Sequence, residues 1–183
     1  MTRGLRTIRD SVTAFAMLAL IWLIAAKLNS DAETVHSGAF HAADGDSLTI
    51  GGERMRLKGI DAPELVQSCE RGGKSWACGR EARDALQRLV SNAGTQCSGT
   101  ERDQYQRLLV ICRSGTLDIN GEMVRTGYAV SYGDYRSEED AARGRRAGLW
   151  AGTFERPRDF RDDERLHSGG GIVRMIGQAV GWN

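Results

Sequence analysis

The stretch that decides the fold is "SLTIGGERMRLKGIDAPE", residues 47–64. Apolar and polar residues alternate on both sides of Gly51-Gly52, and a Gly-Gly pair between two such runs is a strong hairpin signal. The alternation places Met55 and Leu57 on one face of the second strand and Arg56 on the other. The sequence therefore predicts a β-hairpin that carries an arginine on the face away from its apolar side chains.

Carboxylates lie at the ends of these two strands. Asp44 and Asp46 precede the first strand in "DGDS", and Asp61 and Glu64 follow the second on either side of a proline. Each pair alone is typical of a turn. Together, Asp46 and Asp61 from neighbouring strand ends could share one hard cation, which prefers oxygen ligands. Glu64 could then orient or deprotonate a water molecule.

A second arginine opens a later strand. Arg107 begins "RLLVIC" directly after "DQYQ". Two guanidinium groups, Arg56 and Arg107, could clamp a tetrahedral oxyanion by paired hydrogen bonds that lysine cannot reproduce. An activated water, a cation and donors for the growing charge are the groups that phosphodiester hydrolysis requires.

The rest of the periodicity adds helices and further strands. An extended segment in "FHAADGDS" precedes the hairpin, and three strands, a helix and two further strands favour an α+β fold. Its centre would be a five-stranded antiparallel OB-type barrel with about three helices; a generic α+β sheet with packed helices fits equally well. After the hairpin, we predict a loop over 65–79, a helix over 79–94 ending at Gly94, strands over 95–97 and 107–112, a short helix through Met123 and Val124 ending at Gly127, and a helix over 137–150 with Ser137 as N-cap and Gly148 as C-cap.

The N-terminus has the layout of a membrane segment. Arg3, Arg6 and Arg9 precede an uncharged apolar run. We expect a basic cytoplasmic segment over 1–11 and one transmembrane helix over 12–28, with a cleaved signal peptide as the alternative. The basic flank places the remainder outside the inner membrane of a bacterial host. The protein would be a single-pass periplasmic enzyme, or secreted if the segment is cleaved.

Composition divides the remainder into three parts. We expect a linker over 29–38, a folded domain over 39–153, and a charged, Gly-rich, mobile tail over 154–183 with a short helix at 172–180. The net charge is +1, and without residues 1–28 the chain has 21 basic and 23 acidic residues. Net charge therefore does not argue for nucleic-acid binding, so local arginines or a metal must attract a polyanionic substrate. No feature implies an obligate protein partner, and we expect a monomer.

Four cysteines fit an exported protein. An even count in an oxidising compartment favours disulfides. Three pairings are possible; we favour Cys69–Cys78 and Cys97–Cys112, and four buried free thiols are the alternative. Zinc is disfavoured because the chain has no C-x-x-C motif and its three histidines are scattered.

Three separated segments resemble a known family. "DGDS", "RLKGIDAPE" and "DQYQR" are similar, in this order, to the signature segments of the staphylococcal-type thermonucleases. The likeness extends over 39–153 and includes "NGEMVRTGYAVSY" and "ARGRRAGLW". The cysteine-bearing "QSCERGGKSWACG" matches a pattern of exported relatives. The resemblance implies an OB-fold nuclease that uses calcium, acts on DNA and RNA, and leaves 3′-phosphates.

The resemblance also assigns roles to individual residues. It implies calcium ligation by Asp46, Asp61 and the backbone carbonyl of Ala62, phosphate binding by Arg56 and Arg107, water activation by Glu64, a nearby acid in Asp44, and a nucleotide site lined by Tyr105, Tyr132 and Tyr135.

Three positions depart from the family pattern. Ala62 stands where the best-known form has threonine, and Gln106 and Leu108 replace glycines beside Arg107. Bulk at these two positions could narrow substrate access. The alternatives to a nuclease are a weak or inactive OB-fold nucleic-acid-binding module tethered to the membrane, and a tethered interaction domain that docks through its charged tail.

Overall fold

The computed structural model describes residues 2–30 and 33–167. The chain divides into two compact units, Met1–Thr34 and Val35–Asn183. The first unit contains one helix, α1 (Thr2–Ser30). Its apolar stretch is long enough to cross a membrane by length and composition, and a signal sequence near an N-terminus has the same properties. The segment expected to be an anchor or a signal peptide is therefore helical.

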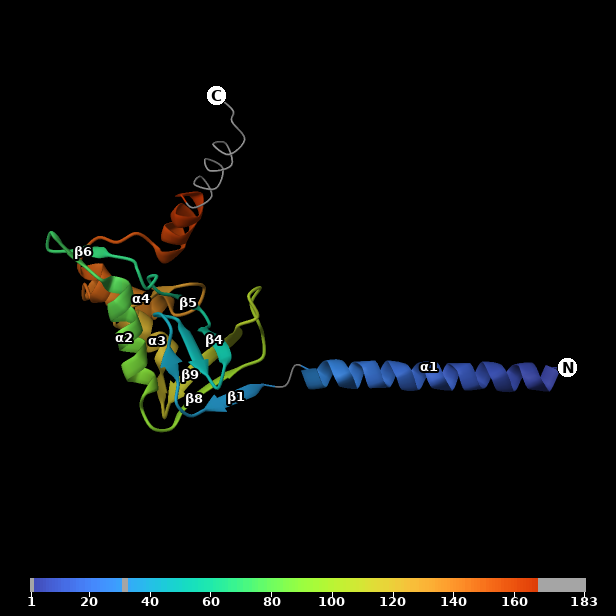
Figure 1. Ribbon diagram of the computed structural model, residues 1–183. Helices are drawn as coiled ribbons and strands as arrows, with labels where there is room; N and C mark the ends of the chain where they lie inside the picture. The colour runs from blue at the N-terminus through green and yellow to red at the C-terminus, as the bar shows by residue number, and fades with distance from the viewer. Residues whose placement is uncertain (1, 31–32, 168–183) are drawn as a thin grey trace, which may run out of the picture. The chain divides into compact units, whose positions relative to one another are not determined.

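The second unit is built on a curled sheet of seven strands (Figure 1). The strand order is β1-β8-β9-β4-β3-β2, with β10 paired to β9. β4 and β9 run parallel, whereas β2–β3, β3–β4, β8–β9 and β9–β10 are antiparallel pairs. The strands are β1 (Thr34–Ser37), β2 (His41–Ala42), β3 (Ser47–Ile50), β4 (Glu53–Leu57), β8 (Thr95–Gly99), β9 (Leu108–Ser114) and β10 (Leu117–Asp118).

This sheet confirms the predicted α+β, OB-type class, as a curled half-barrel. It has seven strands rather than five because two short strands were not predicted. β1 lies inside the expected linker and pairs with β8, and β10 follows a tight turn after β9. Two small sheets add to the fold, β5 (Ile60–Asp61) with β11 (Val130–Ser131), and β6 (Cys69–Arg71) with β7 (Lys74–Trp76).

The predicted hairpin is present with the predicted facing. β3 and β4 pair in antiparallel register around Gly51 and Gly52, both of which have positive φ. Met55 and Leu57 are fully buried, whereas the Arg56 side chain on the other face is 20% exposed. The alternation of the sequence therefore fixes which side of the sheet becomes the core.

Helices cover one side of the curled sheet (Figure 1). α2 contacts β2 and β9, and α3 contacts α2, α4 and β9. The central core combines Leu48, Leu57 and Val110 from the strands with Leu86 and Met123 from these helices. The helical segments are α2 (Cys78–Val90), α3 (Ile119–Arg125), α4 (Arg136–Gly144), the 3-10 helix η1 (Gly148–Ala151) and residues 157–167.

Two predicted helix ends were wrong. The helix expected over 79–94 ends at Val90, and Gly94 follows in a separate turn with φ +84°. The helix expected over 137–150 starts one residue earlier and ends at Gly144. Ser137 is therefore not the N-cap, and its hydroxyl donates to the Glu138 carboxylate at 2.8 Å.

The early end of the helix expected over 137–150 is explained by packing around Gly148. Gly148 opens η1 with φ +53°, and a side chain there would meet the carbonyl oxygen of Gly127 at 2.3 Å. The N–H of Leu149 donates to this same carbonyl at 2.9 Å. The helix ends before Gly148 because the backbone there packs directly against the backbone of Gly127. The end of the short helix before Gly127 was predicted correctly, since α3 stops at Arg125 with Thr126 as its cap.

Both favoured disulfides are present. Cys97 and Cys112 face each other in the β8–β9 register, and Cys69 is bonded to Cys78 at the start of α2. The region expected as a loop over 65–79 contains the hairpin β6–β7 around Gly72-Gly73. A second Gly-Gly hairpin signal is therefore present within the folded domain, and only the first, Gly51-Gly52, led to a hairpin prediction.

The start of the expected mobile tail is docked on the domain. The backbone of Thr153 pairs with Glu70 at 2.9 and 3.0 Å. A second, smaller core holds the same segment. It consists of Cys69, Cys78, Val130 and Leu149, with Trp76, Trp150 and Phe154 packed against them. Residues 157–167 continue as a helix, and the helix expected at 172–180 lies outside the described residues.

Candidate active site

Arg56 joins two predicted metal ligands. Its Nη1 donates to Asp46 Oδ1 at 2.8 Å, and its Nη2 lies 2.7 Å from both Asp46 Oδ2 and Asp61 Oδ1. The hairpin register pairs Ser47 with Arg56, so Asp46 enters β3 beside the arginine, while Asp61 comes from β5. Asp46 and Asp61 are only 3% and 4% exposed, so both carboxylates are buried where they meet Arg56.

The turn before β3 holds Asp46 in place. The Asp44 carboxylate accepts the N–H of Asp46 at 2.9 Å, and Asp46 Oδ2 accepts the N–H of Ala62 at 3.1 Å. A side chain at Gly45 would meet the Cβ atoms of Ala62 and Ala82 at 2.6 and 2.8 Å. The small residue at position 62 thus lets the turn approach β5 closely, a role that the sequence did not reveal.

Burial changes the titration of Asp46. Loss of solvation raises the pKa of Asp46 to about 7; Arg56 opposes this rise, while Asp44 and Asp61 add to it. Arg56 alone therefore does not offset the cost of burying the Asp46 carboxylate. Additional positive charge beside Asp46 would stabilise its ionised form.

This shift predicts a pH dependence of stability. The pKa of Asp46 is higher in the folded than in the unfolded chain, so the folded protein binds more protons between about pH 4 and pH 7. The free energy of unfolding, measured without added divalent cations, should therefore fall as pH rises through this window. Urea unfolding of the parent and of Asp46→Asn across the window measures the effect. Equal pH slopes in both would contradict it.

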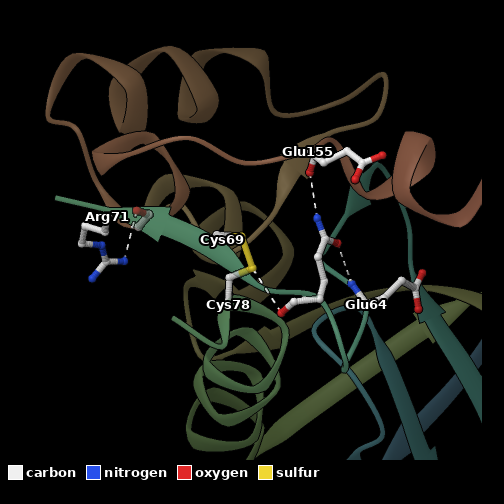
Figure 2. Close-up of a disulfide and its surroundings, with 7 residues drawn as sticks. Glu64, Cys69, Arg71, Cys78 and Glu155 are labelled. Atoms are coloured by element: carbon white, nitrogen blue, oxygen red, sulfur yellow. Dashed lines mark hydrogen bonds between the residues drawn. A yellow bond between two sulfur atoms is a disulfide. The ribbon is translucent and has the colours of Figure 1, made fainter. Parts of the chain in front are cut away.

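The backbone of Glu64 is held in place through the buried side chain of Gln67. Its N–H donates to Gln67 Oε1 at 3.1 Å, and Gln67 Nε2 donates to the carbonyl of Glu155 at 2.8 Å (Figure 2). The Cys78 sulfur lies 3.4 Å from the Gln67 carbonyl oxygen, so the disulfide borders the same loop. Gln67 is 1% exposed. Sequence reasoning missed this buried glutamine, which no motif signals.

Arg161 reaches the site from the C-terminal helix. Its Nη1 lies 2.9 Å from Glu64 Oε1, and its Nη2 donates to Asp61 Oδ2 at 3.0 Å. Burial alone would lower the pKa of Arg161, but its hydrogen bonds to Asp61 and Glu64 raise it, so the guanidinium stays charged. Sequence reasoning missed this residue as well, because it lies in the segment expected to be mobile.

Arg107 is positioned by a carboxylate from its own turn. Its Nε donates to Asp103 Oδ2 at 2.7 Å, and its Nη1 donates to the Ser47 hydroxyl at 3.4 Å. That hydroxyl donates in turn to Asp46 Oδ1 at 3.1 Å, so the two halves of the site are connected. The turn places Gln106 at φ +63°, which explains why a glycine suits this position.

A cleft of about 670 Å³ collects most of the predicted residues. Asp46 is bonded to Arg56 and is not itself part of the lining. Tyr135 does not join the others: it is the left-handed N-cap residue of α4, and its hydroxyl donates to the Asp118 carboxylate at 3.1 Å. The predicted residues that line the cleft are Asp44, Arg56, Asp61, Glu64, Tyr105, Arg107 and Tyr132.

The described residues contain no cluster of three or more His, Cys, Asp or Glu side chains arranged as a metal site. The donors that do converge are carboxylate oxygens, which suit a hard divalent cation. Asp46 and Asp61 both bond one nitrogen of Arg56, and burial, the main cause of the raised pKa of Asp46, makes a cation beside that carboxylate favourable. This donor set fits a calcium ion.

Comparison with known proteins agrees with this geometry. The family described as "Staphylococcal nuclease homologue" matches residues 54–152. A "Succinoglycan biosynthesis protein ExoI" of Rhizobium meliloti is 35% identical over 121 residues, 62% of this chain and 63% of that protein. A "Probable staphylococcal-like nuclease CAN3" of Oryza sativa subsp. japonica is 33% identical over 119 residues, 61% of this chain and 29% of that protein.

A third relative is covered more completely. An "Uncharacterized endonuclease" of Haemophilus influenzae is 31% identical over 137 residues, 68% of this chain and 72% of that protein. The chain thus spans less than two thirds of the first two relatives and more than two thirds of the third. The family match covers more than half of the chain and includes "RLKGIDAPE" and "DQYQR", so the predicted resemblance to this family is confirmed. The chain belongs to the staphylococcal nuclease homologue family.

Proposed function

We propose that this protein is a calcium-dependent nuclease that hydrolyses phosphodiester bonds of DNA, RNA or both, and leaves 3′-phosphates. The observation that carries the proposal is the pair of buried carboxylates, Asp46 and Asp61, on the Arg56 guanidinium. Glu64 and Arg107 line the same cleft. Family membership supports nuclease activity in general, and the arrangement of these side chains supports the finer chemistry.

The carboxylates and one carbonyl would hold the metal. Asp46, Asp61 and the backbone carbonyl of Ala62 are the proposed calcium ligands. Calcium supplies positive charge that polarises the phosphate and offsets the charge that grows on its oxygens. The protein contributes a covered, rigid donor set, since the Asp44–Asp46 turn and the Ala62 N–H fix one carboxylate from two sides.

The remaining side chains act on the phosphate and the water. Arg56 lies in β4, Arg107 directly precedes the parallel neighbour β9, and both line the cleft. They would donate hydrogen bonds to the non-bridging oxygens. Glu64 would accept a proton from the attacking water or orient it. Tyr105 and Tyr132 are 51% and 65% exposed and line the cleft, where they can contact a base or a sugar.

The proposed location follows from α1 and the disulfides. We propose a single-pass inner-membrane protein of a bacterial host with its catalytic domain outside the cytoplasm, or a secreted enzyme if α1 is removed. The apolar stretch Ile8–Ala26 supports insertion, and two disulfides support an oxidising compartment. The enzyme would act as a monomer.

A cleavage assay tests the proposal. The full chain, purified in detergent, should cut single-stranded DNA or RNA in calcium and lose this activity in excess chelator. End analysis should find a 3′-phosphate on one product and a 5′-hydroxyl on the other. A chain that binds the strand without cutting it in calcium would instead support the inactive OB-fold module.

A further inference from the structure

The C-terminal helix over 157–167 forms one wall of the cleft. Arg158, Arg161 and Arg165 are spaced by three and four residues, which places them on one face of the helix. All three line the cleft that also contains Glu64 and Arg107. The wall is therefore built from a segment outside the family match, which ends at residue 152.

The helix is tied to the domain on both sides of its first turn. Before it, Thr153 pairs with the backbone of Glu70, and the Glu155 carbonyl accepts from Gln67 (Figure 2). Within it, Arg161 bonds Asp61 and Glu64 at about 3 Å, with a side chain that is 28% exposed. Such partly covered, charge-assisted bonds fix orientation better than surface ion pairs do. The other two arginines are thereby held over the cleft.

The helix changes the charge of the cleft. Six arginines and five carboxylates line it, and the helix supplies three of the arginines and one carboxylate, Asp162. Without the helix, the lining would have one more carboxylate than arginines. A polyanion would then meet lining side chains whose formal charges sum to −1. With the helix, the balance becomes positive before any metal binds.

We propose that Arg158 and Arg165 bind phosphate groups of the nucleic-acid strand beside the scissile one, and that Arg161 positions the helix that carries them. The inference rests on the proposed nuclease function. The two residues are seven apart, about 10 Å along a helix, so they reach different phosphates. Both are exposed, and the Arg165–Asp162 pair at 3.3 Å is a surface pair that a phosphate can replace. The partner is thus a polynucleotide strand rather than a single nucleotide.

The test measures binding without cleavage. A fluorescent single-stranded DNA is titrated with the full-length protein in excess chelator at several salt concentrations, for the parent and for Arg158→Ala/Arg165→Ala. Each contact to a single strand adds about 0.7 to the slope of log Kd against log salt. The double variant should therefore bind more weakly, with a slope smaller by about 1.4. The charge-reversed Arg158→Glu/Arg165→Glu should weaken binding further.

The matched control removes two exposed arginines from another helix. Arg80 and Arg88 lie on α2 and do not line the cleft, so Arg80→Ala/Arg88→Ala should keep the parent slope. Unfolding curves of all variants check that the fold is retained. An unchanged slope in both Arg158/Arg165 variants would overturn the inference while leaving the nuclease proposal intact. A parent chain that does not bind the strand in chelator would also overturn the inference, while the calcium-dependent cleavage assay decides the nuclease proposal separately.

Discussion

Replacing Glu64 by glutamine is expected to slow calcium-dependent cleavage by roughly two to four orders of magnitude, the usual contribution of a positioned general base. The amide has nearly the same shape. It keeps an oxygen for Arg161 Nη1, and the backbone N–H of residue 64 still donates to Gln67. It cannot accept a proton from water. The loss should therefore appear in kcat, with little change in KM or in the unfolding curve.

Glu81→Gln is a suitable control for this variant. Glu81 is an exposed carboxylate in the first turn of α2 and lies outside the cleft lining. It should retain parental kcat when cleavage of a quenched fluorescent strand is followed in calcium. If Glu64→Gln cleaves as fast as the parent, the base is another group, and the nearby carboxylates Asp44 and Asp103 become the next candidates.

Much of the site follows from local patterns in the sequence. The Gly51-Gly52 turn and the alternation of Met55, Arg56 and Leu57 determine the hairpin register, because a slip by one residue would expose the apolar side chains. This register places Asp46 beside the arginine. The facing of Arg56 and its meeting with Asp46 were therefore within reach of sequence reasoning. The partners of Arg107, Asp103 and Ser47, were not, because Asp103 lies in a turn without periodicity and the contact with Ser47 joins residues 60 apart in sequence.

The contribution of the C-terminal helix could not be predicted in the same way. Residues 154–167 are highly charged, and such composition alone is typical of a solvated segment. What docks them is a backbone bridge between Glu70 and Thr153 and a buried side chain, Gln67. Both are long-range contacts that leave no local periodicity. Tyr135 is the reverse case, since its residue type suits a nucleotide site but it lies outside the cleft lining, with its hydroxyl on Asp118 and its ring beside Gly121.

Removing the Cys97–Cys112 disulfide is expected to lower the free energy of unfolding by about 3 kcal/mol, the value for a loop of about 15 residues in the chain-entropy model. Both cysteines are fully buried on paired strands at the centre of the sheet. The Cys97→Ala/Cys112→Ala variant should keep the β8–β9 register, but its unfolded chain gains conformational entropy because the loop is no longer closed. Urea unfolding at fixed pH measures the change, and the folded fraction should keep the parental specific activity.

Cys69→Ala/Cys78→Ala provides the contrasting case. Its loop is shorter, with a separation of nine residues, so its loss of stability should be slightly smaller, about 2.5 kcal/mol. However, this bond belongs to the small core that holds the C-terminal segment and borders the Gln67 loop that positions Glu64. Its removal should therefore lower the specific activity of protein that remains folded. If the two double variants lose activity only in proportion to their unfolded fractions, the disulfide near Glu64 does not position the site, because global stability alone would then explain both losses.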